Sequence, residues 1–129
     1  MAVEVTPAPI GQIACVVREI LLTEFGSTHG CCQRASVMLW VLLAESGLNA
    51  TVMNGTASGH EHMWLEVHGH LLDVTLDQFT LDSQPPGIVW LPVADARIQW
   101  RYEGRCFTVD RTHRQAQHAR LALARHILK

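Results

Sequence analysis

The stretch HEHMWLEVHGHLLDVTLDQF, from His60 to Phe79, constrains the fold more than any other part of the chain. Apolar and polar side chains alternate on both sides of His68-Gly69, a pair that favours the two-residue turn between antiparallel strands. Side chains alternate between the faces of a sheet, so a turn of this length fixes the face of each residue in the hairpin. The sequence therefore predicts antiparallel strands over residues 62–67 and 70–75.

This register sorts the hairpin side chains onto two faces. One face is apolar except for His70 near the turn, and carries Leu65, Val67, Leu72 and Val74. The other face, which we expect to point away from the core, carries His62, Trp64, Glu66, Asp73 and Thr75. His62 and Asp73 are diagonal neighbours there, about 7 Å apart at the backbone. An imidazole beside a carboxylate is the base and orienting group that nucleophilic catalysis needs.

The rest of the chain predicts helices around this hairpin. Apolar spacing and stop signals at Gly26 and Gly47 indicate helices over Ile10–Phe25 and Cys31–Ser46, the second apolar on every side and therefore central. Further strands are expected over Ala50–Met53, Ile88–Leu91 and Ile98–Tyr102. A C-terminal helix is expected over Asp110–Leu128, with Ala116, Ala119, Leu123 and Ile127 on its apolar stripe. Adjacent strands flanked by helices indicate one α+β domain over residues 1–129, with a largely antiparallel sheet.

Two adjacent cysteines, Cys31 and Cys32, stand at the predicted start of the second helix. The unpaired N–H groups and the dipole of a helix N-terminus stabilise a thiolate, and the same N–H groups can hold an oxyanion. The two side chains point about 100° apart around the helix, so only one of them can meet His62. Helix geometry leaves open which one.

Three motifs in this order resemble the transglutaminase-like branch of the papain-like cysteine enzymes, which includes bacterial peptidases such as lasso-peptide leader peptidases. They are a Cys that opens a buried helix, GLNA just beyond that helix, and HMWLEV followed by LLDVTLDQF. In the family pattern the catalytic Cys stands fifteen positions before the Gly of a GIPA-like element, which selects Cys32 here. The HAW-E-like and DPT-like elements select His62 and Asp73, with Met63 and Val74 replacing the usual Ala and Pro.

The resemblance implies a papain-like, transglutaminase-like α+β fold, with the nucleophile at a helix start packed on a mainly antiparallel sheet and a helix at the C-terminal end. It implies acyl transfer at an amide bond through a Cys32–His62–Asp73 triad and an acyl-enzyme, as in a peptidase, amidase, deamidase or transglutaminase. No cofactor or metal is expected, and the expected substrate is a protein or peptide. A peptide-processing enzyme or a bacterial effector or toxin would fit this activity.

Two alternatives remain open at this point. A zinc site could use His29, Cys31, Cys32, His60 and His62, although adjacent cysteines are not the two-residue-separated pair that usually chelates zinc. A non-catalytic binding module of the same fold is the other alternative. Two further residues could belong to the site: Trp64 could wall the cleft, and Gln78 could donate a hydrogen bond near it.

The charge distribution and the cysteine content indicate where the protein is expected to be located and which partners it is expected to bind. The net charge is −2, but residues 1–96 carry −8 and residues 97–129 carry +6. Without a recognisable nucleic-acid-binding motif, we expect the basic segment to complement the acidic remainder. Met1 to Pro9 lack the basic start of a signal peptide, and the longest apolar run, Val37 to Ala44, is shorter than the about 20 residues that span a bilayer. We therefore expect a cytoplasmic protein, not membrane-bound, with free thiols, among which Cys15 and Cys106 are packing residues.

Overall fold

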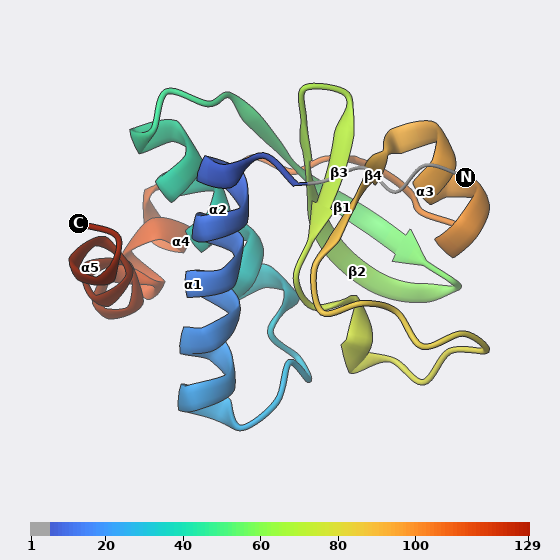
Figure 1. The fold of residues 1–129 in the computed structure, drawn as a ribbon, viewed down its shortest axis with the longest axis horizontal. Helices are drawn as coiled ribbons and strands as arrows, with labels where there is room; N and C mark the ends of the chain where they lie inside the picture. Colours follow the sequence, from blue (N-terminus) through green and yellow to red (C-terminus); the bar gives the residue numbers. More distant parts are fainter. Residues whose placement is uncertain (1–5) are drawn as a thin grey trace.

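The computed structural model describes residues 6–129 and places helices on both faces of a central sheet (Figure 1). The described part contains five α-helices, one 3-10 helix and five strands. The helices are α1 (Ala8–Phe25), α2 (Cys32–Glu45), α3 (Val93–Trp100), α4 (Arg111–Ala116), α5 (His118–Ile127) and the 3-10 helix η1 (Leu76–Gln78). The strands are β1 (Ala50–Ala57), β2 (His60–Val67), β3 (His70–Asp73), β4 (Val89–Pro92) and β5 (Glu103–Cys106). The order β4-β3-β2-β1-β5, antiparallel throughout, confirms the α+β class.

The first two helices match their predicted bounds within two residues. Pro7 precedes the first turn of α1, where a missing N–H costs nothing, and Gly26 ends the helix in the left-handed region with φ of 76°. Most of α2 between Ala35 and Leu43 is buried, as expected of a central helix. Both helices pack on the same face of the sheet, so the start of α2 is brought against β2.

The predicted register of the β2–β3 hairpin is confirmed. Val67 pairs with His70, and Leu65 pairs with Leu72. His68 and Gly69 both have positive φ, as the turn that suits twisted strands requires. A second turn of the same kind joins β1 to β2, and β1 is longer than the predicted Ala50–Met53.

The prediction of a strand over Ile98–Tyr102 is wrong. Residues 98–100 form the end of α3, which begins after Pro92 and has Asp95 in its first turn. The fifth strand, β5, lies further along the chain and pairs with β1. Gly55 and Gly104 face each other in this pair, and a Cβ on Gly55 would overlap the carbonyl oxygen of Glu103. Two glycines therefore allow β5 to lie close to β1, which carries Tyr102 toward the hairpin.

The expectation that one face of the hairpin points away from the core is also wrong. The face with Leu65 and Val67 packs under α1, α2 and α5, as predicted. The opposite face has its own apolar cluster, in which Trp64 packs with Tyr102 and with Trp100 of α3. His62 and Asp73 are therefore covered on both sides of the sheet, and each is 2% exposed.

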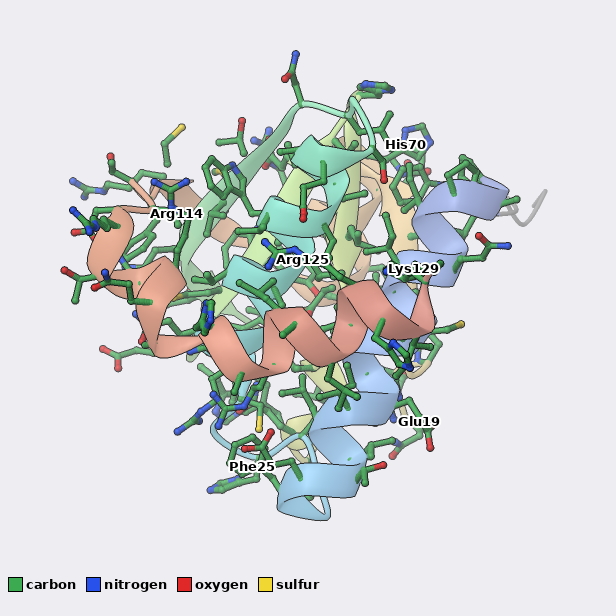
Figure 2. All side chains as sticks on the ribbon, turned by 90° about the vertical axis from the view of Figure 1, so that its left-hand side faces the viewer. Glu19, Phe25, His70, Arg114, Arg125 and Lys129 are labelled. Carbon is green, nitrogen blue, oxygen red and sulfur yellow. The ribbon has the colours of Figure 1, made fainter. Side chains whose placement is uncertain are left out.

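The C-terminal segment forms two helices, not one, because the chain turns at Gln117 (Figure 2). The predicted apolar stripe is wrong, since Leu123 and Ile127 are about half exposed and Ala116 and Ala119 are exposed. The residues that face the core are Gln117, Leu121 and Ala124.

The basic segment is partly neutralised by the acidic remainder. Arg120 forms a two-pronged ion pair with Glu24 of α1, and Arg125 pairs with Glu45 of α2. These contacts hold α5 against α1 and α2.

Cys15 and Cys106 are exposed, so the prediction that they are packing residues is wrong. All four cysteines are free. No helix in residues 6–129 has both the length and the apolar character needed to cross a membrane. The predicted lack of a signal peptide depends on residues 1–9, of which residues 1–5 lie outside the described part.

Candidate functional site

Cys32 is the first residue of α2, and Cys31 is the residue that caps it. The loop from Ser27 to Gly30 leads into this start, and the Cys31 N–H donates to the carbonyl of Thr28. No side chain of the described part of the chain caps this helix, so its first-turn N–H groups lack the side-chain acceptor that usually satisfies one of them. Cys32 is partly exposed, whereas Cys31 is 1% exposed and packs in the core.

His62 on β2 and Asp73 at the end of β3 form a buried pair. The Nε2 atom of His62 lies 2.6 Å from Oδ2 of Asp73. Donation from Nε2–H to this carboxylate leaves Nδ1 as the ring nitrogen that can accept a proton. The hairpin prediction thus placed these two residues correctly, as neighbours on one face.

Asp73 is held as a carboxylate by donors on both oxygens. Oδ1 accepts from the Thr75 backbone N–H at 2.9 Å and from the Thr75 hydroxyl at 3.3 Å. Oδ2 accepts from the Tyr102 hydroxyl at 2.7 Å in addition to His62. Burial acts to raise the pKa of Asp73, but the charge of His62 and these hydrogen bonds lower it below its ordinary value. Burial and the nearby Asp73 charge raise the pKa of Tyr102, so its hydroxyl stays a donor.

The Cys32 thiol and the His62 ring interact as a second pair. Burial raises the pKa of Cys32, but a hydrogen bond with His62, the imidazolium charge and the backbone N–H of Met63 lower it more. Burial lowers the pKa of His62, but the charge of Asp73 and its hydrogen bond raise it to about 9. These opposite shifts favour the thiolate–imidazolium pair over the neutral thiol and imidazole. Burial raises the pKa of Cys31, whereas the pKa of Cys32 is lowered. This difference is the one expected if Cys32 is the nucleophile and Cys31 its neighbour.

Gln78 in η1 connects the loop before Cys31 to the His62 ring. Its Oε1 accepts from the Gly30 N–H at 3.0 Å, and its Nε2 donates to the Thr75 carbonyl at 3.0 Å. The same Nε2 lies 3.4 Å from Nδ1 of His62. The next residue back, Asp77, accepts from the Thr28 hydroxyl at 2.8 Å and pairs with Arg18 of α1. Together, Asp77 and Gln78 fix the nucleophile loop against the hairpin.

Aromatic rings surround the buried histidine. Phe79 meets the His62 ring edge-on at 5.1 Å between centroids and stacks on His60 at 4.5 Å. Trp64 and Tyr102 pack edge-to-face on the other side. The buried Trp64 Nε1 has no hydrogen-bond partner among residues 6–129. His60 also lines a cavity of about 450 Å³, with Trp100 and Arg101 among its other walls. This cavity lies beside His60, and neither Cys32 nor His62 lines it.

The structure thus brings together all three residues of the predicted triad. It does not gather the predicted zinc ligands, since within residues 6–129 no three His, Cys, Asp or Glu side chains are placed to hold a metal ion. Sequence reasoning missed Tyr102 and the carboxylate-binding role of Thr75. It noted Gln78 and Trp64 without assigning their contacts.

Comparison of the chain with protein-family models, with curated proteins and with solved structures found no match in any of the three.

Proposed function

We propose that this chain is a cysteine-dependent acyl-transfer enzyme that acts on amide bonds. The observation that carries the proposal is the environment of His62: its Nε2 lies 2.6 Å from Asp73, and the ring lowers the pKa of the Cys32 thiol. A carboxylate that fixes the tautomer of an imidazole beside a thiol is the arrangement that activates a nucleophile.

The first half of the reaction forms a thioester. His62 Nδ1 holds the proton taken from Cys32, and the thiolate attacks the amide carbonyl carbon, so that the carbon–sulfur bond forms and the carbonyl oxygen becomes an oxyanion. That oxyanion would accept from the first-turn N–H groups of α2, and the lack of a side-chain cap within residues 6–129 supports this role. When the oxyanion collapses, the carbon–nitrogen bond breaks and His62 gives its proton to the departing amine.

The second half releases the acyl group. Water, or a second amine, gives a proton to His62 as its oxygen or nitrogen bonds to the thioester carbonyl carbon. The carbon–sulfur bond then breaks, and the sulfur takes that proton back from His62, which restores the Cys32 thiol and yields an acid or a new amide. Asp73 stays ionised throughout, because its four donors hold the charge, and it stabilises the imidazolium in both halves. The chemistry therefore covers a peptidase, amidase, deamidase or transglutaminase.

The finer predictions from the resemblance belong to the same proposal. We infer a papain-like, transglutaminase-like architecture, supported by a nucleophile at the start of α2 against an antiparallel sheet. A protein or peptide substrate, a cytoplasmic location and a role as a processing enzyme or delivered effector rest on the sequence alone.

Selective alkylation tests the thiolate. Iodoacetamide at neutral pH should label Cys32 faster than the exposed thiols Cys15 and Cys106, which serve as references in the same sample. His62→Ala should remove this preference, and His60→Ala, on the same strand and face, should keep it. Slow labelling of all cysteines at one rate, in a protein with the wild-type circular dichroism spectrum, would contradict the proposal.

Acyl transfer itself needs a second assay. With p-nitrophenyl acetate, we expect a burst of nitrophenol and an acetyl group on the Cys32 peptide by mass spectrometry, which added hydroxylamine removes. Cys32→Ser should lose the burst, and Cys31→Ser, its neighbour, should retain it. Acetylation spread over several cysteines without a burst would refute the assignment of Cys32.

A further inference from the structure

A cavity of about 360 Å³ lies between α2 and α4, away from the triad. Its walls on one side are Gly30, Gln33 and Arg34, and on the other His113 and Gln117. Gly30, Gln33, Arg34 and Val37 recur at the spacing of one helix face, whereas Cys32 lies on another face and interacts with β2. The cavity is therefore distinct from the position of the reacting sulfur. Figure 2 looks onto α4 and α5 on this side of the molecule.

Arg34 gives the cavity a positive charge that no carboxylate of residues 6–129 pairs with. Its Nη1 donates to the Gly30 carbonyl at 3.1 Å, its guanidinium lies 4.8 Å over the Phe25 ring, and it also contacts the Cys31 thiol. Arg18, Arg120 and Arg125, by contrast, are each paired with an acidic side chain. A guanidinium has five N–H donors, so Arg34 has donors left for a ligand.

The other polar walls of the cavity also supply donors. Gln117 is 7% exposed, and its Oε1 accepts from Arg120 at 2.8 Å, which leaves its amide nitrogen as the free end. His113 Nδ1 accepts from the Asp110 backbone N–H at 3.3 Å, so Nε2 carries the ring proton and is left to donate to a ligand. No Asp or Glu lines the cavity. This set of donors around one unpaired guanidinium fits a carboxylate, whose planar oxygens match the guanidinium fork.

The cavity also adjoins the segment that leads to the nucleophile. Gly30 lines the cavity. The Gly30 N–H also donates a hydrogen bond to Gln78, and Gln78 lies against the His62 ring. A peptide that lies over Cys32 and continues past Gly30 would bring its next residues to the cavity, since an extended chain advances about 3.3 Å per residue.

We propose that the cavity between α2 and α4 binds a carboxylate of the substrate, close in sequence to the amide that Cys32 attacks. The carboxylate is that of an acidic side chain or of the peptide C-terminus. This inference rests on the proposed function, which it extends from amide bonds in general to amide bonds flanked by a negative charge.

Binding of three matched small molecules tests this without catalysis. N-acetyl-glutamate α-amide carries only a side-chain carboxylate, N-acetyl-glutamine only a terminal carboxylate, and N-acetyl-glutamine amide carries none. Each is titrated into the full chain with Cys32→Ala, and backbone amide shifts are followed by ¹⁵N NMR. We expect one or both acids to shift Gly30, Arg34 and His113, and the neutral amide to leave them unchanged. Whichever acid binds identifies the source of the carboxylate.

Charge variants complete the test. Arg34→Gln should weaken binding of the acid by about tenfold or more, as expected for loss of a charged hydrogen-bond partner. Arg114→Gln, on α4 but outside the cavity walls, should leave the affinity unchanged. If Arg34→Gln does not fold, Arg34→Lys, which keeps the charge but not the fork, should show the weakened binding.

An equal response to all three compounds, no response up to about 50 mM, or full affinity in the folded Arg34 variants would overturn the proposal. These outcomes concern binding alone and leave the alkylation and burst assays of the triad unaffected.

Discussion

Replacing Asp73 with Asn tests how the buried carboxylate controls the reactivity of Cys32. Burial lowers the pKa of His62, but the charge and hydrogen bond of Asp73, together with Cys32, raise it from 6.5 to about 9. Without the Asp73 charge, the pKa of His62 should fall back toward 6.5. The proton affinity of the ring would then fall by up to roughly 300-fold, at a factor of ten for each pKa unit.

The substitution also changes which ring nitrogen carries the proton. An amide nitrogen in place of Oδ2 would donate to Nε2, so the proton would move to Nδ1, and His62 could no longer accept one from Cys32. Without an imidazolium beside it, the thiol loses the two contributions from His62 that lower its pKa, and burial then dominates. We expect the pKa of Cys32 in Asp73→Asn to rise above its ordinary value of 9.0.

The assay is the rate of alkylation of Cys32 by iodoacetamide between about pH 5 and pH 10, because only the thiolate reacts. The wild-type profile should rise at a pH below the ordinary thiol pKa of 9.0, and the Asp73→Asn profile should rise above it. Asp82→Asn, at an exposed aspartate of the loop after η1, is the matched control. A folded Asp73→Asn protein with the wild-type profile would refute the reasoning.

Three further predictions follow from the same contacts. The rate of p-nitrophenyl acetate turnover should rise with pH as Cys32 loses its proton, below the ordinary 9.0, and fall as His62 loses its own near pH 9; a rate still rising beyond about pH 10 would argue against the pair. Tyr102→Phe should lower the free energy of urea unfolding by about 2 kcal/mol near pH 7. That difference should shrink as the pH falls below the ordinary 3.8 of Asp73, because the stability from a lowered carboxyl pKa is lost on protonation; a difference independent of pH would exclude this cause. Gly55→Ala should force β5 away from β1, since its Cβ would lie 2.5 Å from the Gly104 Cα, and should cost at least about 3 kcal/mol in thermal unfolding. Gly11→Ala, whose Cβ would meet nothing nearer than 3.8 Å, should be neutral or stabilising, and equal losses in the two variants would contradict the packing argument.

The hairpin could be predicted from the sequence because its information is local. A two-residue turn at His68-Gly69 leaves one register, and that register puts His62 and Asp73 on the same face. The choice of Cys32 came from its spacing to Gly47, and the lowered pKa of Cys32 beside His62 agrees with it.

The second apolar cluster and Tyr102 could not be predicted in the same way. Alternation of polar and apolar residues normally indicates one solvated face, but here α3 covers that face and the polar groups satisfy one another. Tyr102 is the single tyrosine of the chain, and its hydroxyl reaches Asp73 across 29 residues. That contact depends on β5 pairing with β1, which residue spacing does not encode.

The predicted strand over Ile98–Tyr102 failed for a different reason. Its Ile, Trp and Tyr favour strands, but Pro92 and Asp95 are signals for the start of a helix, and they decide the structure up to Trp100.

The three side chains of the candidate triad come from two separate parts of the structure. His62 and Asp73 lie in one hairpin and move together, whereas Cys32 moves with the start of α2. Two hydrogen bonds join these parts: the Gly30 N–H donates to Gln78, and the Thr28 hydroxyl donates to Asp77. Loss of these two hydrogen bonds should act first on the position of the sulfur, because the buried hydrogen bonds of Asp73 hold the hairpin. Changes in the loop before Cys32 should therefore affect the coupling of the nucleophile to His62 more than the stability of the fold.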